Sequence, residues 1–359
     1  MISTESLSKE WIDTVSERLG YPDKGLLEKT IRALSLLELM VKADCPLCFK
    51  GGSSLLLLLR NSIHRVSIDV DIICPPGTDI TNYLEGIKEY GFTRAVPSGK
   101  EHPNGTMPVS HSKVFYEIAY RPMLTEEEGY IRLDVLYEDI QYSQLVSVPI
   151  EHPVLKTEGE PVMVKVPTKE DILGDKITAF GPNSIGIPYE KRGRNCSLEI
   201  IKQLFDIGRL FDNVQNFKPT LESFRRVSAM ELSYRGMEGE INRYFEDVRQ
   251  TAMCICTRGY AGEGDFTEII YGLSRIKSFM FQCTYLIESA ITDAAKAAYL
   301  ATCFQFGHTD IEKYSGPESV TERLCIAPPF HSKLNKLKSS NPEAFFYWAK
   351  ASELMSRSQ

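Results

Sequence analysis

The sequence lacks the apolar segments that carry a chain into or across a membrane. No run of apolar residues approaches the ~20 that a membrane-spanning helix needs. The first residues, MISTESLSKEWIDTVSERLG, are polar and acidic, without the basic and apolar zones of a signal peptide. We therefore expect a cytoplasmic protein with no membrane partner.

Two common nucleotide-binding motifs are also missing. The glycine turn at residues 51–54 lacks the Gly-Lys-Ser/Thr ending of a P-loop, which argues against an ATPase of that class. No Gly-x-Gly-x-x-Gly is present, which argues against a dinucleotide-binding fold. Basic residues do not outnumber acidic ones. The formal net charge is −7, so a nucleic-acid substrate would need a local basic groove.

Cysteine is present but does not form a complete metal-binding pattern. Cys45 and Cys48 have the spacing of zinc ligands, yet no second Cys or His pair stands at a suitable distance to complete four ligands. The nine cysteines are an odd number and lie mostly within apolar stretches. We therefore interpret them as small buried hydrophobes in a reducing compartment.

The composition that remains is that of a globular protein of two domains. The chain has 359 residues, of which 43% are hydrophobic and 25% charged. Strand and helix patterns alternate up to about residue 165, and helical patterns dominate afterwards. We predict an α+β fold in which an α/β domain with N-terminal helices, residues 1–165, precedes a mainly helical domain, residues 166–359.

The expected elements follow from hydrophobic periodicity and from turn residues. In the first domain we predict helices at 5–19, 24–43, 55–59 and 80–91, strands at 47–50, 68–73, 111–121 and 130–139, a loop at 95–112, and extended chain at 141–167. In the second we predict helices at 168–179, 197–212, 241–258, 266–290 and 342–356, with a basic loop at 181–195.

The stretch 47–73 carries the strongest indication of chemistry. Asp69 and Asp71 alternate with apolar residues, so both carboxylates should leave one face of a strand, ~7 Å apart. Paired carboxylates suit hard divalent cations such as Mg²⁺. Upstream, Gly51, Gly52 and Ser53 open a helix, where unpaired backbone N–H groups can hold a phosphate. A phosphate turn beside a metal pair indicates nucleotide chemistry.

A third acidic residue, Asp134, has two interpretations. It alternates with Ile131, Leu133 and Val135, so it should face away from that apolar row. It is either a solvent-facing carboxylate or a third acid that sheet pairing brings beside Asp69 and Asp71. Strand register is not readable from the pattern, so both alternatives stay open.

These residues resemble the first motif of the DNA polymerase β-type nucleotidyltransferases, and more narrowly that of the AbiEii/AbiGii toxin family. In that family a Lys-Gly-Gly-Thr/Ser turn is followed by Arg-x-Ser-x-Asp-x-Asp. The matching positions in this sequence are Lys50, Gly51, Gly52 and Ser53, then Arg65, Ser67, Asp69 and Asp71.

Two later segments are similar to the family's second and third motifs. LGDKITAF provides Lys176 and Ala179, with Asp175 in place of the usual glutamate. KQLFDIGRL provides Asp206, with Lys202 at an arginine position and Gln203 in place of an aspartate. The resemblance covers roughly residues 25–212.

The resemblance implies a role for most of the matching residues. Asp69 and Asp71 would hold two Mg²⁺ ions, with Mn²⁺ as an alternative, and Asp134 would complete the acidic cluster and accept a proton. Ser53 and the Gly52 backbone would bind the β- and γ-phosphates of a nucleoside triphosphate, and Lys176 would neutralise its charge. Arg65 and Ser67 would fix the acidic strand or contact nucleotide.

Simpler interpretations stand beside several of these roles. Lys176 would otherwise be a solvated helix lysine, and Arg65 a salt-bridge partner of Asp69 or Asp71. Asp206 is either catalytic or a packing anchor between the two halves, and the apolar residues around it favour packing. The basic run at 191–194 either contacts RNA phosphates or is simply solvated.

The resemblance implies a toxin of a bacterial toxin–antitoxin system that transfers a nucleoside monophosphate from an NTP and releases pyrophosphate. The tRNA 3′ end is the leading acceptor, with a block of translation as the result and a separately encoded antitoxin as regulator. The alternatives are a nucleotidyltransferase that modifies a protein or a small molecule such as an antibiotic, or a nucleotide-binding module that has lost its chemistry.

Overall fold

The computed structural model describes residues 1–101 and 112–357 and separates into two compact units. The first comprises Met1–Thr168 together with Ser278–Thr284. The second comprises Lys169–Lys277 and Tyr285–Gln359. The short segment Ser278–Thr284 therefore returns to the first unit from far along the chain.

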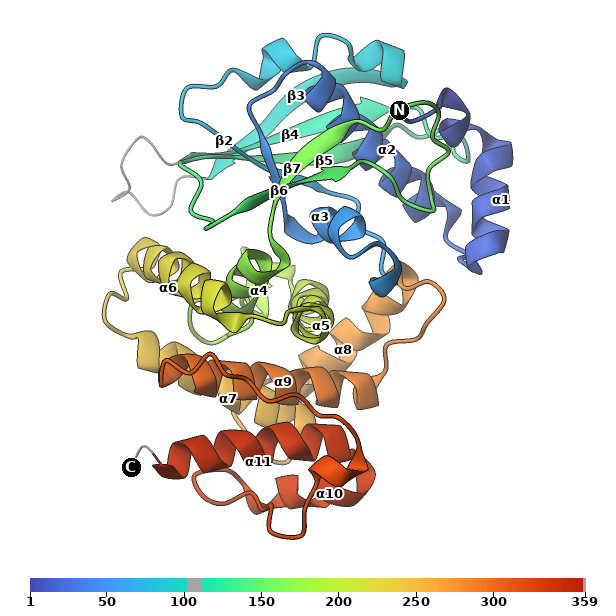
Figure 1. Ribbon diagram of the computed structural model, residues 1–359. Helices are drawn as coiled ribbons and strands as arrows, with labels where there is room; N and C mark the ends of the chain where they lie inside the picture. The colour runs from blue at the N-terminus through green and yellow to red at the C-terminus, as the bar shows by residue number, and fades with distance from the viewer. Residues whose placement is uncertain (102–111, 358–359) are drawn as a thin grey trace. The chain divides into compact units, whose positions relative to one another are not determined.

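The first unit is built on a five-stranded mixed sheet (Figure 1). Its strands stand in the order β1-β2-β5-β4-β3, and β2 and β5 are parallel while the other neighbours are antiparallel. A separate antiparallel ribbon follows in the chain, formed by β6 and β7. The strands are β1 (Cys48–Lys50), β2 (Val70–Cys74), β3 (Phe92–Glu101), β4 (Ser112–Tyr120), β5 (Gly129–Tyr137), β6 (Leu145–Pro149) and β7 (Met163–Pro167).

In the described residues of this unit, three α-helices and several 3₁₀ turns accompany the strands. They are α1 (Lys9–Leu19), α2 (Lys24–Lys42), α3 (Gly51–Leu58), η1 (Thr4–Leu7), η2 (Arg60–Ser62), η3 (Ile80–Tyr83) and η4 (Ile87–Tyr90). The Asp23 side chain accepts from the Leu26 amide and caps the start of α2. Leu27, Ile31 and Leu34 are fully buried, and α2 packs on β2 and β5. The helical period that predicts α2 therefore identifies its buried face.

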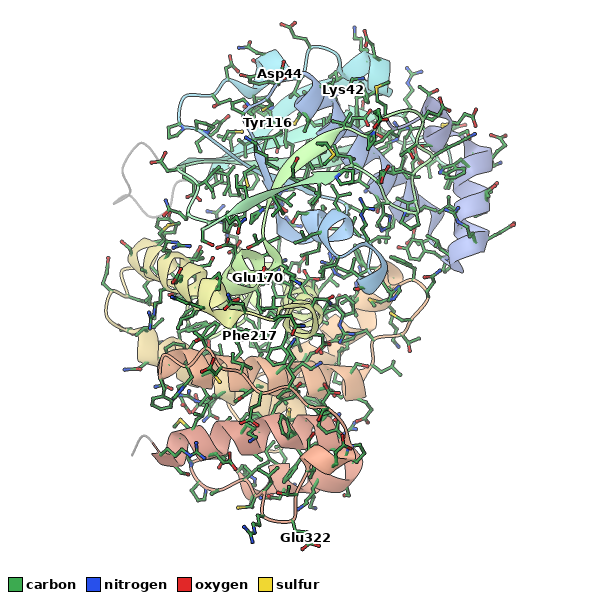
Figure 2. The ribbon with its side chains drawn as sticks, in the orientation of Figure 1. Lys42, Asp44, Tyr116, Glu170, Phe217 and Glu322 are labelled. Atoms are coloured by element: carbon green, nitrogen blue, oxygen red, sulfur yellow. The ribbon has the colours of Figure 1, made fainter. Side chains whose placement is uncertain are left out.

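The second unit is helical. Its elements are α4 (Lys169–Thr178), α5 (Ser197–Asn213), α6 (Phe217–Tyr234), α7 (Ile241–Cys256), α8 (Phe266–Ile276), α9 (Ile287–Gln305), α10 (Leu337–Ser340), α11 (Pro342–Arg357), the turns η6 (Pro317–Ser319) and η7 (Ser332–Lys336), and a small hairpin of β8 (Glu190–Lys191) and β9 (Arg194–Asn195). The turn η5 (Lys277–Phe279) begins with the last residue of this unit before the segment Ser278–Thr284. Aromatic rings fill the core of this unit. The ring centroid of Phe217, which is labelled in Figure 2, lies 5.5 Å from that of Phe211. The ring centroids of Phe211 and Tyr347 lie 5.3 Å apart.

The predicted fold class is confirmed, and three local predictions are wrong. Residues 95–101, expected in a loop, belong to β3, because pairing with β4 overrides their Pro/Gly/Ser-rich composition. The helix expected at 80–91 is two 3₁₀ turns separated by the residues up to Gly86. The helix expected at 266–290 is interrupted by Ser278–Thr284. Residues 102–111 of the expected loop lie outside the described residues.

Within the described part of the chain, no helix combines the length and the apolar character needed to cross a membrane.

Candidate active site

The double glycine at the start of α3 is explained by two close approaches. Gly51 has a φ of +77°, and a Cβ placed on it would lie 2.2 Å from Asp71 Oδ2. A Cβ on Gly52 would lie 2.8 Å from Arg65 Nη2. A side chain at position 51 would overlap the short Asp71 carboxylate, and glycine adopts the φ of Gly51 without strain, whereas a side chain at position 52 would displace the end of Arg65. The Gly51-Gly52 turn thus brings a helix N-terminus directly against the Asp71 carboxylate.

The first turn of α3 also holds the segment that leads into β2. The Ser53 hydroxyl is hydrogen-bonded to the Ser67 hydroxyl at 2.8 Å and to the backbone carbonyl of Asp69. Ser53 is 1% exposed, so this hydroxyl is engaged inside the protein. Lys50 precedes the helix in an extended conformation and its side chain does not cap α3. The α3 amides are therefore the groups of this turn that suit a phosphate.

Strand register brings Asp134 to Asp71. Asp71 is paired with Lys50 across β1 and β2, and with Asp134 across β2 and β5. Residues directly opposite in a sheet share a face, about 5 Å apart. Asp69 comes one residue before β2 begins, so the predicted strand carries Asp71 but not Asp69. One row across three strands therefore contains a lysine and two aspartates.

The neighbouring carboxylates affect the ionisation of Asp71. Burial and the charge of Asp134 raise the pKa of Asp71 to about 6. Asp69 acts in the same direction, while Lys113 and Lys50 act against it. A carboxyl group among carboxylates resists ionisation, and a cation relieves that repulsion.

Asp134 is the most heavily paired acid of the site. It is 7% exposed, which rules out the solvent-facing alternative. Lys113 Nζ lies 3.0 Å from Asp134 Oδ2, and Arg132 Nε donates to Oδ1 at 2.7 Å. Both cations stack on the Phe115 ring, at 5.1 Å for Lys113 and 4.3 Å for Arg132. Asp134 is thus covered by two positive charges.

The fit of these residues to a divalent cation is partial. Among the described residues, no group of three or more His, Cys, Asp or Glu side chains is arranged to hold a metal ion. Asp69 and Asp71 supply the hard oxygen ligands that Mg²⁺ prefers, and the raised pKa of Asp71 indicates a site short of positive charge. Asp134 would become a third metal ligand only if Lys113 or Arg132 moved away from its carboxylate. The three acids expected to hold metal are not gathered as a complete ligand set.

Arg65 is buried beside the same helix turn. It is 2% exposed, and its Nη1 donates to the Val66 carbonyl at 3.0 Å. Its backbone forms an antiparallel bridge with Met280, and the Val66 amide donates to the Phe279 carbonyl at 2.9 Å. The segment Ser278–Thr284 therefore supports the chain just before the acidic residues, and no sequence pattern indicated this.

Lys176 and Asp206 form a buried pair inside the second unit. Lys176 Nζ of α4 lies 2.9 Å from Asp206 Oδ2 of α5. Lys176 is 8% exposed, so it is not the solvated lysine of the simpler interpretation, and Asp206 is 0% exposed. Their pairing joins the helices of the family's second and third motifs. A link by Asp206 between the two halves stays a prediction.

The basic run at 191–194 lies on the β8–β9 hairpin. Lys191, Arg192 and Arg194 are all exposed there, and Arg192 and Gly193 adopt positive φ values of 54° and 75° that close the turn. This exposed cationic hairpin is compatible with either interpretation made from the sequence.

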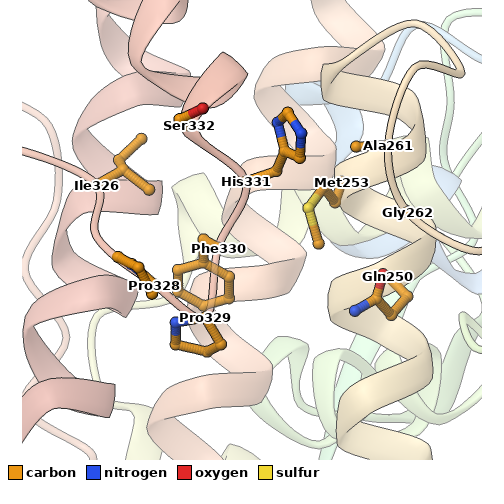
Figure 3. Close-up of a pocket in the computed structure, with 10 residues that line it drawn as sticks. All are labelled: Gln250, Met253, Ala261, Gly262, Ile326, Pro328, Pro329, Phe330, His331 and Ser332. Atoms are coloured by element: carbon orange, nitrogen blue, oxygen red, sulfur yellow. The ribbon is translucent and has the colours of Figure 1, made fainter.

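A cavity of about 510 Å³ in the second unit contains none of the predicted site residues (Figure 3). Its wall is formed largely by Pro328, Pro329, Phe330 and Met253. This apolar lining provides no carboxylate for a metal and no cation for a triphosphate, so the cavity is not the candidate active site.

Sequence reasoning did not identify Lys113 and Arg132 as site residues, and it gave no role to Lys50, although Lys50 matches the first motif. Arg132 stands two residues before Asp134 and therefore lies on the same face of the strand. The alternation of the strand could have predicted this neighbour from the sequence. Burial lowers the pKa of Arg132, but Asp134, Asp69 and Asp71 outweigh this effect and raise it. Lys113 becomes visible only through the β4–β5 register.

Comparison with known proteins gave one family and a set of distant structures. The family model described as "Nucleotidyl transferase AbiEii toxin, Type IV TA system" matches residues 36–293. The structure of JHP933 from Helicobacter pylori is 14% identical over 84% of this chain and 96% of that one, with a TM-score of 0.39. A provisionally assigned nucleotidyltransferase from H. pylori is 16% identical over 80% and 97%, with a TM-score of 0.40. Comparison with curated proteins gave no match.

Proposed function

The chain belongs to the AbiEii family of nucleotidyltransferase toxins from type IV toxin–antitoxin systems, and from this premise we propose that its acceptor is the 3′ end of tRNA. In the proposed reaction the terminal hydroxyl oxygen forms a bond to the α-phosphorus of an NTP, and the bond to the β-phosphate breaks. Pyrophosphate leaves, the hydroxyl proton passes to a base, and the modified tRNA no longer supports translation. The observation that carries the proposal is the direct contact between the Gly51 turn and Asp71, in register with Asp134.

Different residues of the first unit bind the phosphates, bind the metal ion and accept the proton. The α3 amides from Gly52 onward bind the β- and γ-phosphates, because a helix N-terminus favours negative charge. Asp69 and Asp71 hold Mg²⁺, or Mn²⁺ in its place, which supplies charge neutralisation when bound. Asp134 accepts the hydroxyl proton once Lys113 or Arg132 moves off its carboxylate. Arg65 and Ser67 hold the acidic segment against α3.

The second unit contributes charge. Lys176 neutralises the triphosphate, and Asp206 orients the Lys176 ammonium group. The exposed hairpin of Lys191, Arg192 and Arg194 contacts tRNA phosphates, which supplies the local basic surface that an acidic protein needs. The reaction takes place in the cytoplasm, where tRNA and a cognate antitoxin are present.

The test is a transfer assay with Mg²⁺ and each labelled NTP in turn. Total tRNA, total cell protein and a set of small-molecule acceptors are offered in separate tubes. The active-site variant is D71N, and D79N is its control, because Asp79 is an exposed aspartate that only caps Thr81. We expect label in tRNA with the wild type and D79N, and none with D71N.

The remaining outcomes separate the alternatives. Asp71-dependent label in protein, and none in tRNA, would contradict the tRNA acceptor and support the protein-modifying alternative. Absence of transfer from every NTP to tRNA, protein and small-molecule acceptors would support a binding module that has lost its chemistry. Equal transfer by wild type and D71N would show that Asp71 is not in the active site.

A further inference from the structure

The first unit contains a second cavity, of about 420 Å³, that the proposed reaction does not use. It lies at the end of α1, beside the turn that follows α3, and residues 152–153 and 281–282 form the rest of its wall. Helix α3 has its glycine turn at one end and Arg60 just past the other, and eight helical residues span about 12 Å. The cavity is therefore distinct from the Asp71 site.

His152 presents an unpaired donor in this cavity. Its side chain is 6% exposed, and its Nδ1 accepts from the Val154 amide at 3.3 Å. Burial and the charge of Arg60 lower the pKa of His152 to about 4, so the ring is neutral at pH 7 with its proton on Nε2. Nε2 is buried and has no hydrogen-bond partner among the described residues. Buried polar atoms are almost always paired, so this one needs an explanation.

His64 also lines this cavity and shows the same feature. Its Nδ1 is also buried and without a hydrogen-bond partner in the described part of the chain. The His64 and His152 rings contact the Phe281 ring edge-on, at centroid distances of 5.6 Å and 6.3 Å. The Phe281 amide donates to the His64 carbonyl at 3.0 Å. Two imidazole rings therefore contact the same aromatic ring in the wall of the cavity.

Two arginines add positive charge to the cavity wall. Arg60 Nη2 lies 3.5 Å from Glu151 Oε2, a contact that occupies one of five guanidinium N–H groups. Arg18 donates to the Pro153 carbonyl and packs on the Trp11 ring at 5.5 Å. With Glu151 counted, the two arginines leave one positive charge in excess. The wall therefore offers several donors and a net cation, which together suit an oxyanion.

We propose that this cavity is a phosphate-binding site in which His152 Nε2, His64 and Arg60 hold the phosphate oxygens. Phosphate presents acceptors in several directions at once, and arginine binds it through paired N–H groups. The volume admits a phosphate together with part of the molecule that carries it. The phosphate is either a free anion or part of a nucleic-acid backbone, and the chemistry of recognition is the same. This site does not depend on the proposed transfer reaction.

The test observes the two histidines directly. The full-length protein, labelled with ¹⁵N at histidine, is titrated with inorganic phosphate and, separately, with a short single-stranded RNA, and the ring ¹⁵N–¹H signals are recorded by NMR. Variants R60Q and R18Q lie at the exposed rim and should fold. R94Q is the matched control, an exposed arginine of the same unit that also pairs with a glutamate, Glu128.

We expect saturable shifts of the His152 and His64 signals, with affinity reduced about tenfold or more in R60Q and unchanged in R94Q. Shifts with inorganic phosphate identify a free-anion site, and shifts with RNA alone identify a backbone site. If neither probe moves these signals, or if R60Q and R94Q bind equally, the proposal is overturned. Melting curves of each variant confirm that any loss of binding is not unfolding.

Discussion

At the scale of single residues, the active-site candidate is decided by how closely Asp71 approaches Gly51. The carboxylate occupies the space where any other residue at position 51 would carry its side chain. Because β2 is paired on both sides, Asp71 cannot move away without breaking the row that contains Lys50 and Asp134. The glycine is therefore part of the geometry of the site as much as the aspartate is.

Substitution of Gly51 by alanine tests whether activity requires the close approach of Asp71 to this position. The φ of +77° costs about 1–2 kcal/mol for alanine, and the Asp71 carboxylate must also shift. A displacement of about 1 Å in an active site reduces the reaction rate about 100-fold. We therefore expect the rate of label transfer by G51A to fall by about this factor. The measurement is the initial rate of label transfer together with the thermal midpoint.

The control for this substitution is G77A. Gly77 has a similar φ of +85°, but nothing lies within 4 Å of the position of a Cβ. G77A should lose comparable stability and keep its activity. If both variants were equally impaired in transfer, the close approach of Asp71 would not be the cause.

Asp71 should also limit the stability of the protein at neutral pH. Its pKa is raised to about 6, so between pH 4 and 6 the folded state binds more protons than the unfolded state. The stability of the wild type therefore falls as the pH rises through this range. D71N lacks this group and should be more stable than the wild type by about 3 kcal/mol at pH 7, and this difference should nearly vanish near pH 4. Unfolding by denaturant in the presence of a chelator, at pH 4 to 8, measures this difference.

Addition of Mg²⁺ in the same experiment tests the metal site. The ion should stabilise the wild type at pH 7 and leave D71N unchanged, because it binds the folded state through the ionised carboxylate. A wild-type midpoint insensitive to millimolar Mg²⁺ would argue against Asp69 and Asp71 as ligands.

At the scale of elements, helices α4 and α5 are joined by one buried charge pair. Removal of Lys176 alone would leave Asp206 charged and fully buried, which costs about 3–5 kcal/mol. The double variant K176M/D206L replaces both charges with apolar groups and should recover most of that stability. Unfolding curves of K176A and K176M/D206L measure the two effects.

The same pair of variants tests the role of Lys176 in catalysis. If Lys176 neutralises the triphosphate, K176M/D206L should be stable and still inactive. A double variant that regains both stability and activity would assign to Lys176 a structural role only.

At the scale of the whole molecule, family membership predicts an effect on cells. Induced expression of the wild type in bacteria should arrest growth, because the proposed reaction would withdraw modified tRNA from translation. Expression of D71N at equal level should leave growth unchanged, and it provides the control for the burden of expression. Growth that continues despite active enzyme in the cell extract would contradict the toxin role.

Local sequence patterns predicted much of the fold and part of the candidate active site. The sequence by itself determined the α+β class, the helical period of α2 and the combination of Gly51-Gly52 with Asp69 and Asp71, because each depends on residues close together in the chain. It could not reveal β3, whose composition is that of a loop, because strand pairing with β4 stabilises it from outside the segment. Nor could it place Ser278–Thr284, which pairs with residues more than 200 positions earlier.

The tertiary structure alone decided how the acids are arranged. Asp134 faces Asp71 only because β2 and β5 pair in parallel with that register, and a shift of one residue would turn the carboxylate to the other face. The same pairing placed Lys113 and Arg132 on Asp134, and the return of Phe281 to His64 enclosed the second cavity. Contacts between distant segments depend on register and packing, which no local pattern in the sequence encodes.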